Sequence, residues 1–132
     1  MAHTIVGSCR HKWLRTPARK VRLVADLVRG ESVDAALRML PYVQKSGAEW
    51  VYKGVKAASA NAMSSRADDA PRIRPEDLYI AEIFVDEGMA FKRFQAASMG
   101  RAGKIRKRTS HLTVKVAVRA AEVVTATEPA EA

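Results

Sequence analysis

The feature that most restricts how this chain can fold is a basic segment between residues 89 and 111. It contains seven cations and no carboxylate, namely Lys92, Arg93, Arg101, Lys104, Arg106, Lys107 and Arg108. Because a buried cation without a partner is strongly destabilising, this segment cannot lie inside a core. It must face water or a polyanion, and the rest of the chain must supply the core.

The composition of the remaining chain allows one folded domain. A chain of 132 residues with 48% hydrophobic residues can bury a core but is too short for two domains. Its net charge of +9 predicts attraction to nucleic acid or to anionic membranes. No apolar run approaches the ~20 residues of a membrane span, and the first residues lack the pattern of a signal peptide. The only cysteine, Cys9, excludes an internal disulfide and fits a reducing compartment.

The clearest helix signal begins at Thr16-Pro17, with Thr16 as the expected N-cap and Pro17 at the first helical position. The helical spacing predicts a buried stripe of Val21, Val24, Ala25 and Val28, widened by Leu23 and Leu27. Gly30 is expected to close this helix in a left-handed conformation.

Two further helices follow. Ser32 is the expected N-cap of a helix from Val33 to Leu40, which Pro41 ends. A capping box at Ser46-Gly-Ala-Glu49 predicts the start of a third helix. Its expected core face consists of Val51, Val55, Ala58 and Ala62, and small residues around Gly54 would let it pack closely. An exposed loop is expected from Ser64 to Asp77.

Three segments have the character of strands: His3 to Lys12, Leu78 to Val85, and the alternating run around Leu112 to Val118. If the last two pair antiparallel, their hairpin turns near Ala97 to Gly100 and each arm spans about 50 to 60 Å. A domain of this size has a radius of gyration of only about 12 Å, so the hairpin must project beyond it. Because an isolated two-stranded ribbon is marginally stable, an anionic partner is expected to order it.

Basic residues also gather around the first helix, and their single sign favours phosphate binding over an ordinary solvated surface. This cluster consists of Arg10, Lys12, Arg15, Arg19, Lys20, Arg22 and Arg29. Trp13 is interpreted as a core residue, with stacking on a base as the alternative. In the basic segment, Phe91 and Phe94 flank Lys92-Arg93, which suits RNA stacking unless the two rings pair across the ribbon.

Catalysis finds little support in the sequence. The three histidines and Cys9 lack the spacing of metal ligands, and no nucleophile elbow or phosphate loop is present. The adjacent carboxylates Asp68-Asp69 and Asp86-Glu87 are interpreted as solvating groups or charge partners of nearby arginines. No catalytic residue, metal or cofactor is therefore expected.

Several stretches match a known pattern in collinear order over residues 13 to 118. They are Arg19 to Gly30, Ala58 to Ala62, Val85 to Gly88, Lys92-Arg93, Met99 to Ala102 and, most specifically, Ile105 to Val114 (IRKRTSHLTV). In these stretches the chain resembles the bacterial large-ribosomal-subunit protein twenty-two family. It departs from the family at Gln95 to Ser98, where an Arg-Pro-Arg-like stretch is usual, and at Pro17, which is displaced by one residue.

The resemblance implies an α+β fold, with a small three-stranded antiparallel sheet packed with three helices and a long protruding β-hairpin. Residues 1–118 would form one rRNA-binding domain with its hairpin at about 86–111, followed by a disordered tail at 119–132. The protein would be a structural part of the large subunit in the cytoplasmic ribosome. It would bind 23S rRNA, aid assembly and line the nascent-peptide exit tunnel. Its partners would include neighbouring large-subunit proteins such as ribosomal protein four, and the nascent polypeptide, but no membrane and no small-molecule substrate.

Two sets of site residues follow from the charge pattern and the resemblance together. The set expected to bind rRNA is Arg10, Lys12, Arg15, Arg19, Lys20, Arg22, Lys92, Arg93, Arg101, Lys104, Arg106, Lys107, Arg108, Thr109, Ser110 and His111. The set expected in the tunnel hairpin is Phe91, Lys92, Arg93, Phe94, Gln95, Met99, Gly100 and Arg101. Two alternatives remain, a DNA-binding module that uses Thr16 to Gly30 as a recognition helix and a nuclease that depends on Asp86.

Overall fold

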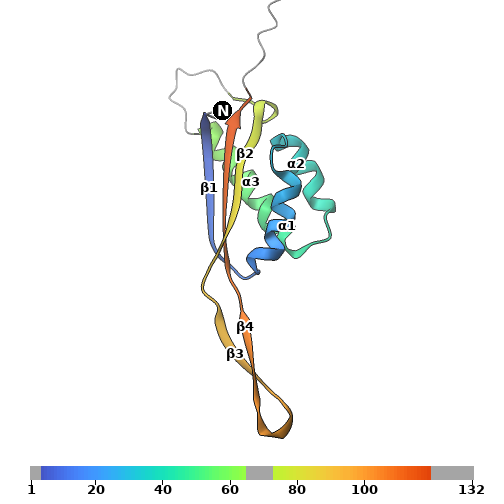
Figure 1. Cartoon of the computed structure of the whole chain (residues 1–132). Coiled ribbons are helices and arrows are strands. Elements are labelled where there is room, and N and C mark those ends of the chain that lie inside the picture. Colours follow the sequence, from blue (N-terminus) through green and yellow to red (C-terminus); the bar gives the residue numbers. More distant parts are fainter. Residues whose placement is uncertain (1–3, 65–72, 120–132) are drawn as a thin grey trace, which may run out of the picture.

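Three helices pack on one side of a three-stranded antiparallel sheet, and a long two-stranded ribbon projects from one end of that sheet (Figure 1). The computed structural model describes residues 4–64 and 73–119. The sheet has the order β1 (Ile5–Leu14), β5 (Ser110–Val118), β2 (Leu78–Glu87). The expected α+β fold, with three helices, three antiparallel strands and a protruding hairpin, is therefore confirmed.

The core lies between the sheet and the helices α1 (Ala18–Val28), α2 (Val33–Met39) and α3 (Ser46–Ser64). Helix α3 packs against β1 and β5, while α1 packs against β2 and α3. Two short 3-10 turns, Leu40–Tyr42 and Pro75–Asp77, connect the larger elements. The other face of the sheet is more open and carries Phe84, Glu82 and Lys115, as expected for an antiparallel sheet with one buried face.

Helix α1 buries only part of the face that its sequence predicts. Val21, Val24, Ala25 and Val28 are fully buried, as expected. Leu23 and Leu27, however, are 60% and 52% exposed, so the expectation that they widen the apolar face is wrong. At 100° per residue both leucines fall on the side of the helix away from the buried stripe, and an apolar side chain need not be inside.

The start and end of α1 also differ from the prediction. Pro17 itself occupies the N-cap position and no side chain caps the helix, so the expected cap by Thr16 is wrong. Gly30 does adopt a positive φ of 81°. Its N–H donates to the Ile80 carbonyl at 3.1 Å, so Gly30 joins the end of this segment to β2. By contrast, Ser32 caps α2 through its hydroxyl as predicted.

Helix α3 lies unusually close to the sheet because small residues line the contact. Its predicted core face of Val51, Val55, Ala58 and Ala62 is fully buried. A Cβ added at Gly54 would lie 3.1 Å from Leu112, which confirms the expected close packing. The helix begins at Ser46, and the Glu49 carboxylate accepts a hydrogen bond from Lys53 at 2.6 Å.

The ribbon consists of β3 (Phe91–Ala96) and β4 (Ala102–Lys107), which pair antiparallel. Its turn at Ser98–Gly100 falls where the sequence predicts, with positive φ at Met99 and Gly100. The ribbon forms a sheet of its own, because the pairing of β2 with β5 ends at Glu87 and Ser110 and that of β3 with β4 begins only at Phe91 and Lys107. We call the junction at residues 88–90 and 108–109, with the adjoining start of α1, the neck. Of the predicted tail at 119–132 the structure describes only Arg119, whose N–H donates to the Asp77 carbonyl at 2.9 Å, and most of the predicted loop at 64–77 also lies outside the described residues.

Candidate nucleic-acid interface

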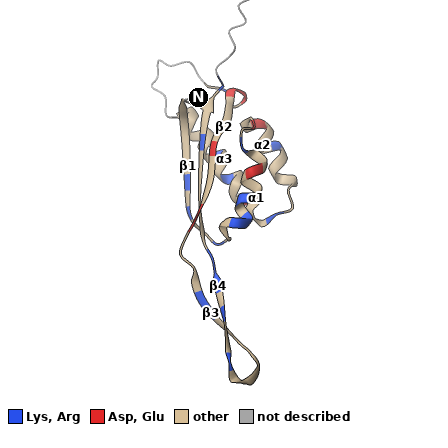
Figure 2. Ribbon diagram, viewed as in Figure 1, with Lys and Arg blue, Asp and Glu red and all other residues tan. Residues whose placement is uncertain are grey.

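Positive charge runs along the ribbon and around its root, whereas the acidic side chains lie on the domain, several of them at its far end and two, Asp86 and Glu87, where β2 meets the ribbon (Figure 2). Every lysine and arginine of the predicted rRNA-binding set is exposed. The ion pairs between described residues join Arg29 to Asp26, Arg38 to Asp34, Lys53 to Glu49, and Lys115 to Glu82. None of them involves a cation of the predicted set, so no described carboxylate pairs with these charges.

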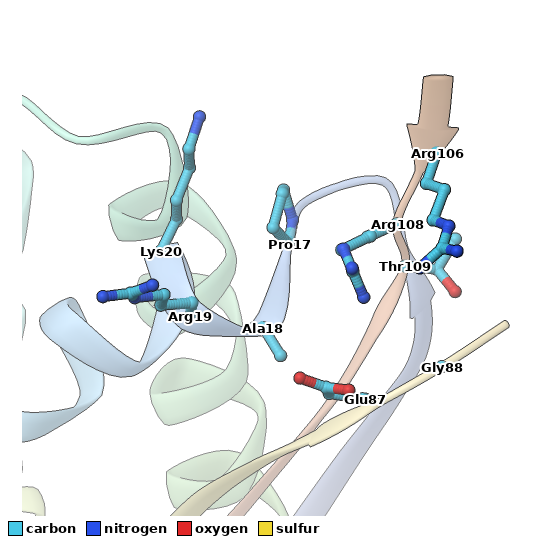
Figure 3. Close-up of a pocket in the computed structure, with 9 residues that line it drawn as sticks. All are labelled: Pro17, Ala18, Arg19, Lys20, Glu87, Gly88, Arg106, Arg108 and Thr109. Carbon is cyan, nitrogen blue, oxygen red and sulfur yellow. The ribbon is translucent and has the colours of Figure 1, made fainter. Parts of the chain in front are cut away.

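Arginines on α1 and directly after it help to hold the helix against the sheet. Arg22 Nε donates to the Val85 carbonyl at 3.0 Å, and Arg29 Nη2 donates to the Ile83 carbonyl at 3.1 Å. Arg19 and Lys20, one turn earlier, point into solvent near the ribbon root (Figure 3). The start of α1 thus supplies exposed cations, while Arg22 and Arg29 stabilise the fold.

Aromatic contacts position the root of the ribbon. The backbone N–H of Trp13 donates to His111 Nδ1 at 3.1 Å, and the two rings meet edge to face with centroids 4.7 Å apart. Trp13 is 54% exposed, so its assignment to the core is wrong. It lies in a β-bulge between His11 and Leu14 with a φ of 61°, which turns its ring out of the sheet.

Arg15 connects the end of β1 with the ribbon through an aromatic contact. Its guanidinium lies 5.1 Å from the centroid of the Phe91 ring, and that of Arg93 lies 5.9 Å from the same ring. These cation–π contacts gather two cations of the predicted set at the ribbon root. Phe94 is 80% exposed and follows Phe91 on the same strand at a spacing of three, so the two rings do not pair across the ribbon.

Three polar residues of the predicted set have different surroundings from the cations. Thr109 and Ser110 are buried, and the Thr109 hydroxyl donates to the Met89 carbonyl at 2.6 Å. His111 is half-buried beneath Trp13. A Cβ at Gly88 would come within 2.5 Å of the Thr109 hydroxyl, so the neck requires glycine there. These residues hold the two arms of the neck together.

Two hollows flank the neck. The first, of about 490 Å³, lies between the start of α1 and the ribbon root; we call it the neck pocket, and Figure 3 shows its lining residues. They are Pro17, Ala18, Arg19, Lys20, Glu87, Gly88, Arg106, Arg108 and Thr109. The second, of about 610 Å³, is lined by Arg15, Pro17, Phe91, Arg93, Ile105, Arg106, Lys107 and Arg108. Both hollows are dominated by arginine and lysine.

The rest of the ribbon presents its side chains to solvent. Only Phe91 and Ile105 are partly buried, while Lys92, Arg101, Lys104 and Lys107 are exposed. Residues 94–100 carry no charge, and Gln95, Met99 and Gly100 lie at or beside the turn. The ribbon is therefore basic along its length, and its tip combines the uncharged residues 94–100 with the single cation of Arg101, which closes the turn.

Sequence reasoning overlooked Pro17, Gly88 and Glu87 as parts of this site. Asp86 and Glu87 lie at the end of β2, and among the described residues neither forms an ion pair, although Glu87 shares a hollow with Arg19, Arg106 and Arg108. The pattern Glu-Gly at a strand end beside a basic run was the available signal. Among residues 4–64 and 73–119, no group of three or more histidine, cysteine or carboxylate side chains could hold a metal ion. Within the same ranges, every helix is too short or too polar to cross a membrane.

A small basic α+β domain with an exposed cationic ribbon is typical of the class of proteins that bind nucleic acid. Comparison with known proteins narrows this class. The family described as Ribosomal protein L22p/L17e matches residues 9–117. The large ribosomal subunit protein uL22 of Ligilactobacillus salivarius (strain UCC118) is 47% identical over 108 residues, which cover 82% of this chain and 90% of that protein.

The chain therefore belongs to the L22p/L17e family of ribosomal proteins, and the family resemblance of its sequence is confirmed. It is a protein of the large ribosomal subunit, a structural component and not an enzyme. Its place in the cytoplasmic ribosome follows from this membership. The nuclease alternative is thereby set aside.

Proposed function

We propose that this protein binds 23S rRNA through its neck and ribbon, aids assembly of the large subunit and lines the nascent-peptide exit tunnel with its hairpin. The observation that carries the proposal is the ribbon itself. Its cations are exposed, no ion pair between described residues engages them, and almost no apolar surface is buried beneath them. Such an element is stabilised by a partner that supplies the missing negative charge.

Phosphate contacts account for most of the proposed binding. The cations of the predicted set approach RNA from two directions, one group from β1 and α1 and the other from the ribbon. Between them lie the two hollows of the neck. A-form RNA hides its base edges in a narrow groove, so backbone and shape contacts dominate over reading of sequence.

The uncharged stretch at residues 94–100 supports the proposed place in the tunnel. A surface that a nascent polypeptide must pass works best without strong charge, because fixed cations would retain acidic segments. Phe94 and Met99 are 80% and 93% exposed in this uncharged stretch. Contacts with ribosomal protein four, with other large-subunit proteins and with the nascent chain are part of the proposal, as is a single rRNA-binding domain at 1–118.

Site-specific cross-linking in intact ribosomes tests this proposal. A photoreactive residue is placed at Lys92, Arg101 or Arg19, and the attached RNA is sequenced. We expect adducts from Lys92 and Arg101 with 23S rRNA of the tunnel wall, and adducts from Arg19 with rRNA outside the tunnel. Lys53 is the matched control, because its ammonium is engaged by Glu49 on helix α3, away from the neck. Adducts from Lys53 alone would contradict the proposal.

A duplex-DNA comparison distinguishes the DNA-binding alternative. Arg22 on α1 and Arg29 directly after it are hydrogen-bonded to carbonyl groups of β2, so they are not free to read a groove. We expect structured rRNA to bind far more tightly than duplex DNA at moderate salt. Equal affinities would favour the DNA-binding module.

A further inference from the structure

The neck pocket contains one carboxylate among four cations. Glu87 lines it together with Arg19, Lys20, Arg106 and Arg108, yet Glu87 forms no ion pair with any described residue. In Figure 3 the Glu87 carboxylate and the Arg108 guanidinium point into the space beside Pro17 and Ala18, whereas Arg19 and Lys20 point away from it. A free carboxylate repels RNA phosphates, so phosphate binding alone does not explain a glutamate at this place.

The shape of the pocket suits a single nucleotide. Its volume of about 490 Å³ falls in the range of small-ligand sites. The ring of Pro17 and the methyl group of Ala18 provide an apolar wall on one side, where the face of a base can exclude water. Arg106 and Arg108 lie on the ribbon side of the pocket, where they can meet the phosphates that flank that base.

The chemistry of a carboxylate selects among the four bases. An ionised carboxylate only accepts hydrogen bonds, through two oxygens side by side. Guanine is the RNA base that presents two adjacent donors, N1–H and the N2 amino group, on one edge. Adenine and cytosine offer one amino donor beside a ring acceptor, and uracil offers one N–H between two carbonyl oxygens, so each would place an acceptor against a Glu87 oxygen.

We propose that the neck pocket takes one unstacked guanine of RNA, with Glu87 accepting from its N1–H and N2 amino group while Arg106 and Arg108 hold its phosphates. This inference rests on the proposed RNA-binding function and adds a base-specific contact to a surface that otherwise reads phosphates. Base edges are open to such reading in single-stranded loops and bulges. The competing role for Glu87 is to moderate the positive charge of the neck without touching a base.

The test uses the full chain and nine-nucleotide RNAs, measured by fluorescence anisotropy at several salt concentrations. The probes are oligouridine and the same strand with guanosine, inosine, adenosine or cytidine at its centre. We expect the guanosine strand to bind roughly tenfold more tightly than oligouridine, because a good bidentate contact discriminates by about this factor or more. Inosine lacks the N2 amino group and is expected to lose most of the preference.

Two variants locate the contact. Glu87→Gln keeps the size of the side chain but replaces one acceptor with a donor, so we expect it to lose the guanosine preference. Asp86→Asn removes the same charge from the neighbouring residue, which does not line the pocket, and is expected to keep the preference. Circular dichroism verifies that both exposed-site variants are folded.

The outcomes separate this inference from the proposed function. Salt-dependent binding of every strand without a guanosine preference overturns the inference and leaves RNA binding standing. A preference that survives in Glu87→Gln overturns the assignment to Glu87. Equal tightening of all strands by Glu87→Gln and Asp86→Asn, with the preference unchanged, indicates the charge-moderating role instead. Failure to bind any RNA at low salt contradicts the proposed function, and the inference with it.

Discussion

At the scale of single residues, Gly7 sets the distance between β1 and α3. An added Cβ would lie 2.6 Å from the Ala58 carbonyl oxygen and 2.6 Å from the Ala62 Cβ, both on the helix. Backbone atoms cannot swing aside, so we expect Gly7→Ala to lower the free energy of unfolding by about 1–3 kcal/mol. Urea denaturation measures this loss. Gly103→Ala is the control, since its Cβ would meet only the Gln95 carbonyl at 3.6 Å, and an equal loss there would contradict the packing argument.

Cys9 offers a second test at this scale, because burial raises the pKa of its thiol. Only the thiolate reacts with iodoacetamide, and a raised pKa leaves less thiolate at neutral pH. We expect Cys9 to be alkylated several-fold more slowly in the folded protein than in urea at pH 7.5, with the folded rate rising as pH increases. Mass spectrometry follows the reaction. A folded rate equal to that of the unfolded chain would show that the thiol is open to solvent.

Residue by residue, the sequence predicted burial well where periodicity decided it. Val21, Val24, Ala25 and Val28 repeat at helical spacing and are all in the core. Trp13 and Leu23 were misplaced because hydrophobicity alone does not determine burial. The left-handed backbone of Trp13 depends on a bulge in the pairing of β1 with β5, which no local pattern announces.

At the scale of elements, the ribbon differs from the sheet that it continues. In the domain, Leu112, Val114 and Val116 are fully buried, whereas β3 and β4 expose nearly every side chain. We expect backbone order parameters below about 0.6 at Ala97 in the free protein, and near 0.85 at Val114. NMR relaxation measures both, and equal order along the ribbon and the sheet would contradict this. Adding an rRNA fragment should raise the value at Ala97.

The ribbon and the place of its turn were predictable, because the alternating strand at Leu112 to Val118 and the strand-like segment at Leu78 to Val85 pair antiparallel around a fixed midpoint. The interruption of strand pairing at the neck, which separates the ribbon from the sheet, was not predictable, since it depends on contacts between distant residues. Thr109 bonds to Met89, and Arg15 stacks on Phe91, across long separations in sequence. The neck pocket follows from this break, so the same limitation hid Glu87 as a site residue.

At the scale of the whole molecule, the separation of charge determines how binding depends on salt. Cations run along the ribbon and around its root, whereas the acidic residues lie on the domain, several of them at its far end (Figure 2). If about ten cations contact phosphates, the logarithm of rRNA affinity should fall with the logarithm of salt with a slope on the order of −7 to −9. Filter binding between 50 and 300 mM salt measures it. A slope near −2 would contradict the proposed interface.

Removing the ribbon separates its role in folding from its role in binding. Glu87 and Ser110 face each other in the register of β2 and β5, so an Asn-Gly turn can replace residues 88–109. Because the ribbon buries almost no apolar surface, the free energy of unfolding should change by less than about 1 kcal/mol. The salt slope should lose about 5 to 6 units in magnitude, because the replacement removes seven cations.

A matched variant distinguishes the effect of the ribbon's charge from the effect of its length. It keeps residues 88–109 but changes the seven lysines and arginines of this segment to glutamine. If phosphate contact is the main role of the ribbon, this variant and the deletion should show the same slope. If the deletion alone prevents incorporation into the large subunit, the length of the ribbon has a role beyond charge, as expected for an element that reaches a tunnel. If the deletion variant no longer unfolds cooperatively, the contacts of the neck support the core. That outcome would contradict the view that the domain folds by itself and that its partner orders the ribbon.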